Sequence, residues 1–225
     1  MTRLISRLVY YFHLSWVRVL LAIITTRDVK GMKNVPKKGP LILASNHMSN
    51  GDPPVITGSF PRPIAWLTKA EWFKTPFVGW QFRLAGMIPV RRFEADLGAL
   101  RQAQRLLEDG GVLGMFPEGT RGGDRGLQRG EPGSALVALR SGAPILPAAI
   151  WGTEHVKLPG HLFRRTHTHL RFGKPFKLER SGSKITRQDV ELGTERIMRE
   201  IAALLPEQWR GLYRDETPAE PLKAG

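Results

Sequence analysis

The sequence predicts a single α/β domain with a mixed, largely parallel sheet flanked by helices. Short apolar runs typical of buried strands alternate along the chain with segments of helical periodicity. Such alternation is typical of parallel sheets whose strands are connected by helices. The chain has 225 residues and a hydrophobic fraction of 41%, which suffices for one domain with a sizeable core.

Five apolar runs are the candidate strands, and they cover residues 40–45, 64–67, 87–90, 112–116 and 145–150. Helical patterns occupy residues 94–108, 134–140 and 187–205. The last helix begins after Thr186, a suitable N-cap, and ends before Pro206. In sheets of this kind, ligands bind where strand ends meet loops.

We expect three parts along the chain. They are an amphipathic, membrane-associating helix in residues 1–27, the α/β domain in residues 28–206 and a polar C-terminal tail in residues 207–225. On a helical wheel Arg3, Arg7 and Arg18 share one side, and aromatic and aliphatic residues cover much of the rest. This pattern favours a helix that lies in a membrane interface over a spanning helix or a cleaved signal peptide. The alternative is a helix packed on the domain's own core with its arginines in water.

The charge balance indicates an anionic partner. Lysine and arginine number 34 against 20 acidic residues, which gives a net charge of +14. Nucleic acid, an anionic membrane surface and phosphorylated substrates all fit such a charge. The membrane is favoured, because the basic N-terminal segment is also strongly apolar and no nucleic-acid-binding motif is visible. The absence of cysteine excludes disulfides, cysteine-ligated metals and a cysteine nucleophile.

The most distinctive segment follows the first candidate strand and reads SNHMSNGDP from residue 45 to residue 53. Its Asn, Gly and Pro residues favour a turn, which can bring His47 and Asp52 together. Asp52 can then accept a hydrogen bond from one imidazole nitrogen, which leaves the other nitrogen to take a proton from a hydroxyl group. A lone HxxxxD pattern is weak, but three further blocks accompany it.

Those blocks are GMIPVRR at residues 86–92, FPEGTR at residues 116–121 and ILPAAI at residues 145–150. In this order and at these spacings, the four blocks resemble the motifs of the glycerophospholipid acyltransferase family. Within that family the likeness is greatest to bacterial 1-acyl-sn-glycerol-3-phosphate acyltransferases. The resemblance covers roughly residues 30–155.

The resemblance implies an enzyme of phospholipid biosynthesis that moves a fatty acyl group from acyl-CoA or acyl carrier protein to a lysophospholipid acceptor. The acceptor would be 1-acyl-sn-glycerol 3-phosphate and the product phosphatidate. His47 is the implied general base and Asp52 its orienting partner, with no cofactor and no metal. The enzyme would lie at the cytoplasmic face of the cell membrane, peripheral or monotopic.

The resemblance also implies a set of substrate-binding residues. The basic members would bind the acceptor phosphate, and Glu118 would hold a hydroxyl or orient Arg121. Gly119 would let the backbone approach the substrate closely. The full set is Asn46, Lys69, Arg92, Glu118, Gly119, Thr120 and Arg121.

One departure leaves the acceptor open. Many relatives have a lysine just before the glycine that begins the helix after the third block, whereas this chain reads RGEPG at residues 129–133. Either Arg129 replaces that lysine, or the acceptor is another lyso-lipid or glycerol 3-phosphate. A basic nucleic-acid-binding module is the alternative from a different functional class.

A second basic and aromatic stretch spans residues 66–83. Rings beside lysine and arginine favour a bilayer interface, and they can also line a tunnel for an acyl chain. Ordinary core packing is an equal alternative for most of these rings.

Overall fold

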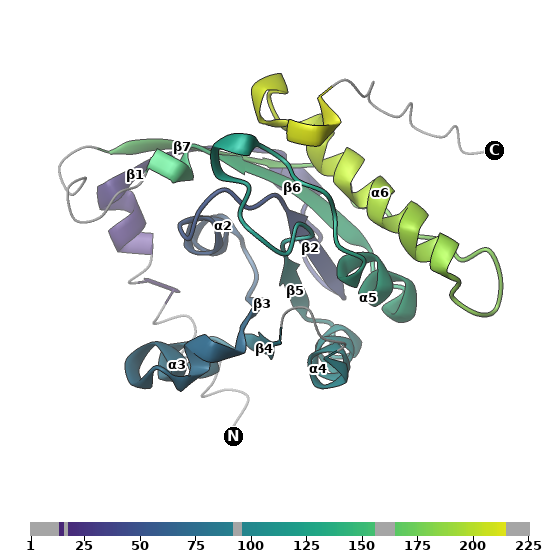
Figure 1. The fold of residues 1–225 in the computed structure, drawn as a ribbon. Coiled ribbons are helices and arrows are strands. Elements are labelled where there is room, and N and C mark those ends of the chain that lie inside the picture. The colour runs from purple at the N-terminus through teal and green to yellow at the C-terminus, as the bar shows by residue number, and fades with distance from the viewer. Residues whose placement is uncertain (1–13, 16–17, 92–95, 156–164, 215–225) are drawn as a thin grey trace.

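The computed structural model describes residues 14–15, 18–91, 96–155 and 165–214 (Figure 1). Within these residues the sheet has seven strands in the order β1-β7-β6-β2-β5-β3-β4. Neighbouring strands pair in parallel except β6 and β7, which are antiparallel. The strands are β1 (Thr25–Lys30), β2 (Leu41–Ser45), β3 (Ile64–Lys69), β4 (Ile88–Val90), β5 (Val112–Met115), β6 (Ile145–Trp151) and β7 (Thr166–Phe172). The predicted α/β fold with a mixed, largely parallel sheet is therefore confirmed.

The sheet is covered by helices on both faces, and β2 shows why its residues are uniformly apolar. Leu41 and Leu43 pack with Val55 and Ile56 of α2 (Asp52–Ser59) on one face. Ile42 and Ala44 belong to the core on the other face. A strand buried on both sides requires a continuous apolar run rather than alternation.

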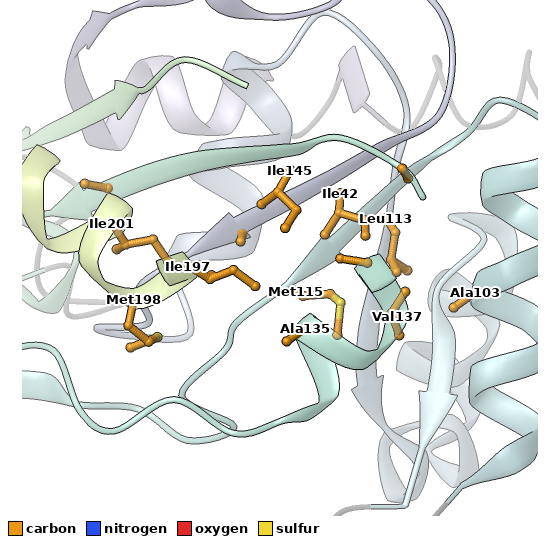
Figure 2. Close-up of a cluster of buried hydrophobic side chains, with 14 of the residues drawn as sticks. Ile42, Ala103, Leu113, Met115, Ala135, Val137, Ile145, Ile197, Met198 and Ile201 are labelled. Atoms are coloured by element: carbon orange, nitrogen blue, oxygen red, sulfur yellow. The ribbon is translucent and has the colours of Figure 1, made fainter. Parts of the chain in front are cut away.

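The larger core lies between the sheet and three helices. These are α4 (Leu97–Glu108), α5 (Gly133–Ser141) and α6 (Arg187–Leu204). In Figure 2, Ile197 and Ile201 of α6 belong to the same cluster as Ile145 of β6, and Ala135 and Val137 of α5 lie near Met115 and Leu113 of β5. This packing holds the central strands in place and so fixes the positions of the loops at their ends.

The predicted helices are present, with small changes at their ends. The helix expected over residues 94–108 begins at Leu97, because the side chain of Asp96 accepts a hydrogen bond from the backbone of Ala99 and caps it. At the start of α6, Thr186 and Asp189 form a reciprocal capping box. Thr186 is thus the N-cap that the sequence predicted.

Four elements were not predicted. The edge strand β1 is largely polar, and β7 alternates polar and apolar residues, so neither has a continuous apolar run. Helix α2 has eight residues and α3 (Pro76–Leu84) nine, and each begins with proline in its first turn. Such short helices show too few repeats for the helical period to be recognised in the sequence.

Most of the expected N-terminal helix, including Arg3 and Arg7, lies outside the described residues. Residues 18–24 are helical and lead directly into β1. Leu21 is buried in the core of the α2 face, and Arg18 donates hydrogen bonds to the carbonyl oxygens of Gly58 and Phe60. The strand β1 runs across the domain boundary expected at residue 27. None of the helices in the described ranges is long and apolar enough to cross a membrane.

At the other end of the chain, the packed structure continues past the boundary expected at residue 206. Two 3₁₀ helices, η5 (Glu207–Trp209) and η6 (Gly211–Tyr213), follow α6. Leu127 donates a backbone hydrogen bond to Trp209 and accepts one from Leu212. Tyr213 is buried, so residues 207–213 belong to the domain rather than to a free polar tail.

Candidate active site

The turn between β2 and α2, residues 45–52, contains the predicted pair and is called the His47 turn below. Strand β2 lies between β5 and β6 in parallel with both, so the turn is at the carboxyl edge of the sheet's centre. The His47 Nδ1 atom lies 2.7 Å from Asp52 Oδ2. Asp52 is fully buried, whereas the His47 side chain is 10% exposed. The structure therefore brings together the two side chains that the motif predicted to meet.

The Asp52 carboxylate is held by four donors. Its Oδ2 atom accepts hydrogen bonds from the backbone N–H groups of Met48 and Ser49, at 2.6 and 2.8 Å, in addition to the imidazole. Its Oδ1 atom accepts the hydroxyl of Thr153. Because a carboxylate accepts at Nδ1, the imidazole proton is assigned to that nitrogen and the lone pair to Nε2. Among the described residues, none is recorded as a hydrogen-bond partner of Nε2.

The imidazole also stacks on an aromatic pair. The ring centroids of His47 and Phe116 are 4.0 Å apart with an interplanar angle of 14°. Phe116 in turn stacks on Trp66 at 4.7 Å, and the Trp66 indole donates to the Thr57 hydroxyl at 2.9 Å. The stack fixes the plane of the imidazole from the side, while Asp52 fixes its rotation.

The loop after β5, residues 116–128, holds the backbone of His47 and is called the Glu118 loop below. The Glu118 carboxylate accepts the N–H of His47 at 2.7 Å and the N–H of Gln128 at 2.8 Å. Gly122 donates its N–H to the carbonyl oxygen of His47 at 2.8 Å. Burial is the main reason that the pKa of Glu118 rises from 4.5 to about 7. The loop thus binds both backbone groups of the candidate base.

This arrangement gives Glu118 a use different from those expected. The carboxylate does not bind the Arg121 side chain, and both of its oxygens are engaged by backbone N–H groups. Arg121 is exposed and donates instead to the Asn50 side chain at 3.2 Å. Gly119 has φ of 63°, a left-handed conformation that glycine adopts without strain, and Thr120 is exposed at the same bend.

The remaining predicted residues lie in different places. Asn46 is buried, and both polar atoms of its amide bind the Ile150 backbone of β6 at 2.8 Å, so it connects the His47 turn to the neighbouring strand. The amide is used in the fold, and a contact of Asn46 with substrate stays a prediction. Lys69 is exposed at the end of β3, at the same edge of the sheet as His47. Arg92 lies outside the described residues.

Three residues that shape the site were not predicted from the sequence: Thr153, Phe116 in its stacking role, and Trp66. Thr153 lies 101 positions from Asp52 along the chain. The available signal is its place just after β6, the strand beside β2, because loops at the ends of adjacent parallel strands lie close together. That signal requires the strand order, which the sequence pattern does not contain.

A surface hollow lies away from His47, and the described residues contain no candidate metal site. A surface hollow of about 430 Å³ is lined by α5 and the start of α6, and none of its lining residues belongs to the His47 turn or the Glu118 loop. In the described part of the chain, no group of three His, Asp or Glu side chains is placed to hold a metal ion.

Comparison with known proteins gives consistent matches. A family model described as Acyltransferase matches residues 26–151. A 1-acyl-sn-glycerol-3-phosphate acyltransferase of Borreliella burgdorferi is 32% identical over 60% of this chain and 55% of its own length. One from Bacillus subtilis is 29% identical over 74% of this chain and 81% of its own length.

A solved structure agrees with these relatives. The crystal structure of the 1-acyl-sn-glycerophosphate acyltransferase PlsC from Thermotoga maritima has 28% sequence identity and a TM-score of 0.63, covering 88% of this chain and 83% of that one.

The match to several relatives is partial on their side. This chain spans 43% of a Brassica napus relative and 38% of an Arabidopsis thaliana relative, both named as chloroplastic acyltransferases. The matched region nevertheless includes both the His47 turn and the Glu118 loop. Since the family model covers more than half of the chain, this protein belongs to the acyltransferase family.

Proposed function

We propose that the protein transfers a fatty acyl group from acyl-CoA or acyl carrier protein to the free hydroxyl of 1-acyl-sn-glycerol 3-phosphate, giving phosphatidate. The observation that carries the proposal is the buried His47–Asp52 pair, whose Nε2 atom has no recorded partner among the described residues. The names of the relatives support the same acceptor and reaction. Membership of the acyltransferase family leaves the nucleic-acid-binding alternative without support.

The proposed reaction uses the tautomer assigned to His47. Nε2 of His47 takes the proton of the acceptor hydroxyl as its oxygen attacks the thioester carbonyl carbon. A carbon–oxygen bond forms, and the tetrahedral intermediate then breaks its carbon–sulfur bond. The proton held by the imidazolium passes to the departing thiolate. Asp52 stabilises the positive imidazolium during both steps, because its carboxylate lies 2.7 Å from Nδ1.

The acceptor phosphate is assigned to basic residues near this edge. Arg121 donates a hydrogen bond to Asn50 of the His47 turn, and this contact supports its assignment to the phosphate site. Lys69 ends β3, the strand next to β5 at the same edge. These two residues together with Arg92 form the proposed phosphate site, in which the arginine forks match pairs of phosphate oxygens.

The membrane is the proposed location, with the enzyme peripheral or monotopic at its cytoplasmic face. The helix that precedes β1 exposes three apolar side chains in its described part, Val19, Leu20 and Ile23, at 54%, 47% and 51%. Apolar side chains of this kind can enter the interface of a bilayer, which is also the source of a lyso-lipid acceptor. The part of residues 1–27 that precedes β1 is accordingly the proposed interfacial helix.

The decisive experiment is a panel assay with product mass as the readout. Acyl-CoA and acyl-carrier-protein donors are each tested with lysophosphatidate, with other lyso-lipids and with glycerol 3-phosphate. We expect phosphatidate from lysophosphatidate to be the main product. A different preferred acceptor would keep the chemistry and replace the headgroup, in line with the RGEPG departure at residues 129–133.

The role of the imidazole is tested by His47→Ala. Loss of a general base typically lowers the rate by about 10²–10⁴-fold, so we expect kcat to fall by that factor while the fold is retained. The matched control is His167→Ala, because His167 is exposed on β7 and lies outside the site. Normal turnover by His47→Ala would refute the mechanism.

A further inference from the structure

Three large aromatic side chains are exposed together on the segment after β3. This segment, residues 70–84, consists of the 3₁₀ helix η2 (Ala70–Lys74) and α3, and is called the η2–α3 unit. Trp72, Phe77 and Trp80 are 49%, 70% and 53% exposed. The ring centroids of Phe77 and Trp80 lie 6.4 Å apart. Single exposed apolar residues are common, but neighbouring large rings mark an interaction surface.

The three rings are exposed although the η2–α3 unit itself is well packed. A side chain at Gly79 would collide with the carbonyl oxygen of Phe73, so α3 crosses η2 at the closest approach that glycine permits. Arg83 donates to the same carbonyl at 2.8 Å, and the rings of Phe73 and Phe82 meet edge to face at 5.8 Å. The packing between η2 and α3 is therefore fixed, while Trp72, Phe77 and Trp80 stay exposed.

The charges around the rings are mainly positive. Lys69, Lys74 and Arg83 are exposed, and Glu71 is the acidic residue of this segment. A surface that combines aromatic rings with lysine and arginine is complementary to the interface of an anionic bilayer, where the rings enter the headgroup layer and the cations meet phosphates.

The position of the unit suits this role. It leaves β3 at the carboxyl edge of the parallel strands, the edge that also carries His47, with only β5 between β3 and β2. Strand β1 is parallel to β7, which is antiparallel to β6, so the helix before β1 lies at this edge as well. In Figure 1 the purple helix before β1 and the blue α3 are both on the same side of the molecule as α2.

We propose that the η2–α3 unit docks on an anionic lipid bilayer and forms a second attachment surface, separate from residues 1–27. The candidate active site would then lie between two membrane contacts. The exposed rings and cations support membrane docking whether or not the protein is an acyltransferase of lysophosphatidate. The idea that docking gives access to a lyso-lipid acceptor rests on the proposed function.

The test is sedimentation of the full chain with vesicles of equal parts phosphatidylcholine and phosphatidylglycerol. We expect the double variant Phe77→Ser, Trp80→Ser to bind at least about tenfold more weakly, because buried aromatic area is lost. Lys74→Gln is expected to weaken binding roughly fivefold, and only when phosphatidylglycerol is present. The matched control is Leu192→Ser on α6, because Leu192 is 63% exposed and lies outside the unit.

The outcomes separate this inference from the proposed function. Vesicle binding by the double variant within twofold of the parent, with unchanged circular dichroism, would overturn the docking surface. A parent dimer that the double variant dissociates, with equal vesicle binding, would assign the rings to a second copy of the chain and overturn it too. Turnover is measured in parallel on a short-chain, water-soluble lysophosphatidate, where both proteins should be equal. If neither turns over, the proposed function fails while the vesicle result still decides the docking surface.

Discussion

The His47 turn follows β2 and the η2–α3 unit follows β3 at the same edge of the sheet. The two segments differ in which kinds of side chain they bury and expose. In the His47 turn, a charged side chain is buried and paired: Asp52 is fully buried and accepts four hydrogen bonds. In the η2–α3 unit, large apolar rings are exposed, with Phe77 at 70%. The first region excludes water from polar atoms, and the second leaves apolar atoms in contact with it.

The difference shows where the molecule requires precision. A general base, the role proposed for His47, works only within a narrow range of distances and angles. Its neighbours Asp52, Glu118 and Phe116 are each held by a further contact. A surface that docks on lipid needs area and charge, and many side chains provide both. Substitutions in the His47 turn should therefore change the reaction, whereas substitutions in the η2–α3 unit should change attachment.

The largest effect is expected from Asp52→Asn. The amide can still accept the N–H groups of Met48 and Ser49, but it carries no charge to stabilise the imidazolium of His47. We expect kcat to fall by at least about 10²-fold, with little change in vesicle binding. Single-turnover kinetics and sedimentation measure the two effects.

Asp52→Ala sharpens the result, because it removes the acceptor altogether. Four donors then lose their acceptor, namely the N–H groups of Met48 and Ser49, the His47 imidazole and the Thr153 hydroxyl. Each donor left unpaired costs about 1–3 kcal/mol, so this variant should be clearly less stable than Asp52→Asn in urea unfolding. The exposed Asp124→Asn is the matched control. Equal kcat in Asp52→Asn and the parent would show that the reaction does not require the charge of Asp52 beside His47.

A smaller effect, on stability, is expected from Glu118. Its pKa is raised from 4.5 to about 7, so the folded state binds more protons than the unfolded state between these values. Its contribution to stability is therefore fully present below pH 4.5 and is lost as pH rises through about 7. The loss is on the order of 3 kcal/mol.

Glu118→Gln is the comparison, since an amide does not titrate. We expect the unfolding free energy of the parent to fall relative to this variant between pH 4.5 and pH 8, measured by urea titration at each pH. Phe77→Ser should instead follow the parent at every pH. Parallel curves for the parent and Glu118→Gln would contradict the assigned pKa direction.

The smallest effect is expected from Thr153, which acts through Asp52. Thr153→Val keeps the shape but removes the hydroxyl that Asp52 Oδ1 accepts. We expect kcat to fall about tenfold with KM unchanged, because a hydrogen bond to a charged group is lost. Thr153→Ser restores the hydroxyl and should recover most of the rate. A change in KM alone, or no recovery by serine, would assign Thr153 a packing role only.

Sequence patterns located the central strands and the long helices well. Continuous apolar runs marked β2, β5 and β6 because these strands are buried on both faces. The edge strand β1 escaped this test, since its partly exposed residues need not be apolar. The short helix α2 was not predicted either. The segment around Asp52 was therefore interpreted as a turn, although Asp52 is the first residue of this helix.

The sequence by itself determined the His47–Asp52 pair, because two residues five positions apart can meet through one local turn. The tertiary structure decided what supports that pair: Thr153 is 101 positions from Asp52, and Glu118 is 71 positions from His47. Such contacts depend on which strands lie side by side in the sheet. That strand order is set by how the helices and strands pack together. Local spacing carries no information on that order, so the His47–Asp52 contact was predictable and the contacts that support it were not.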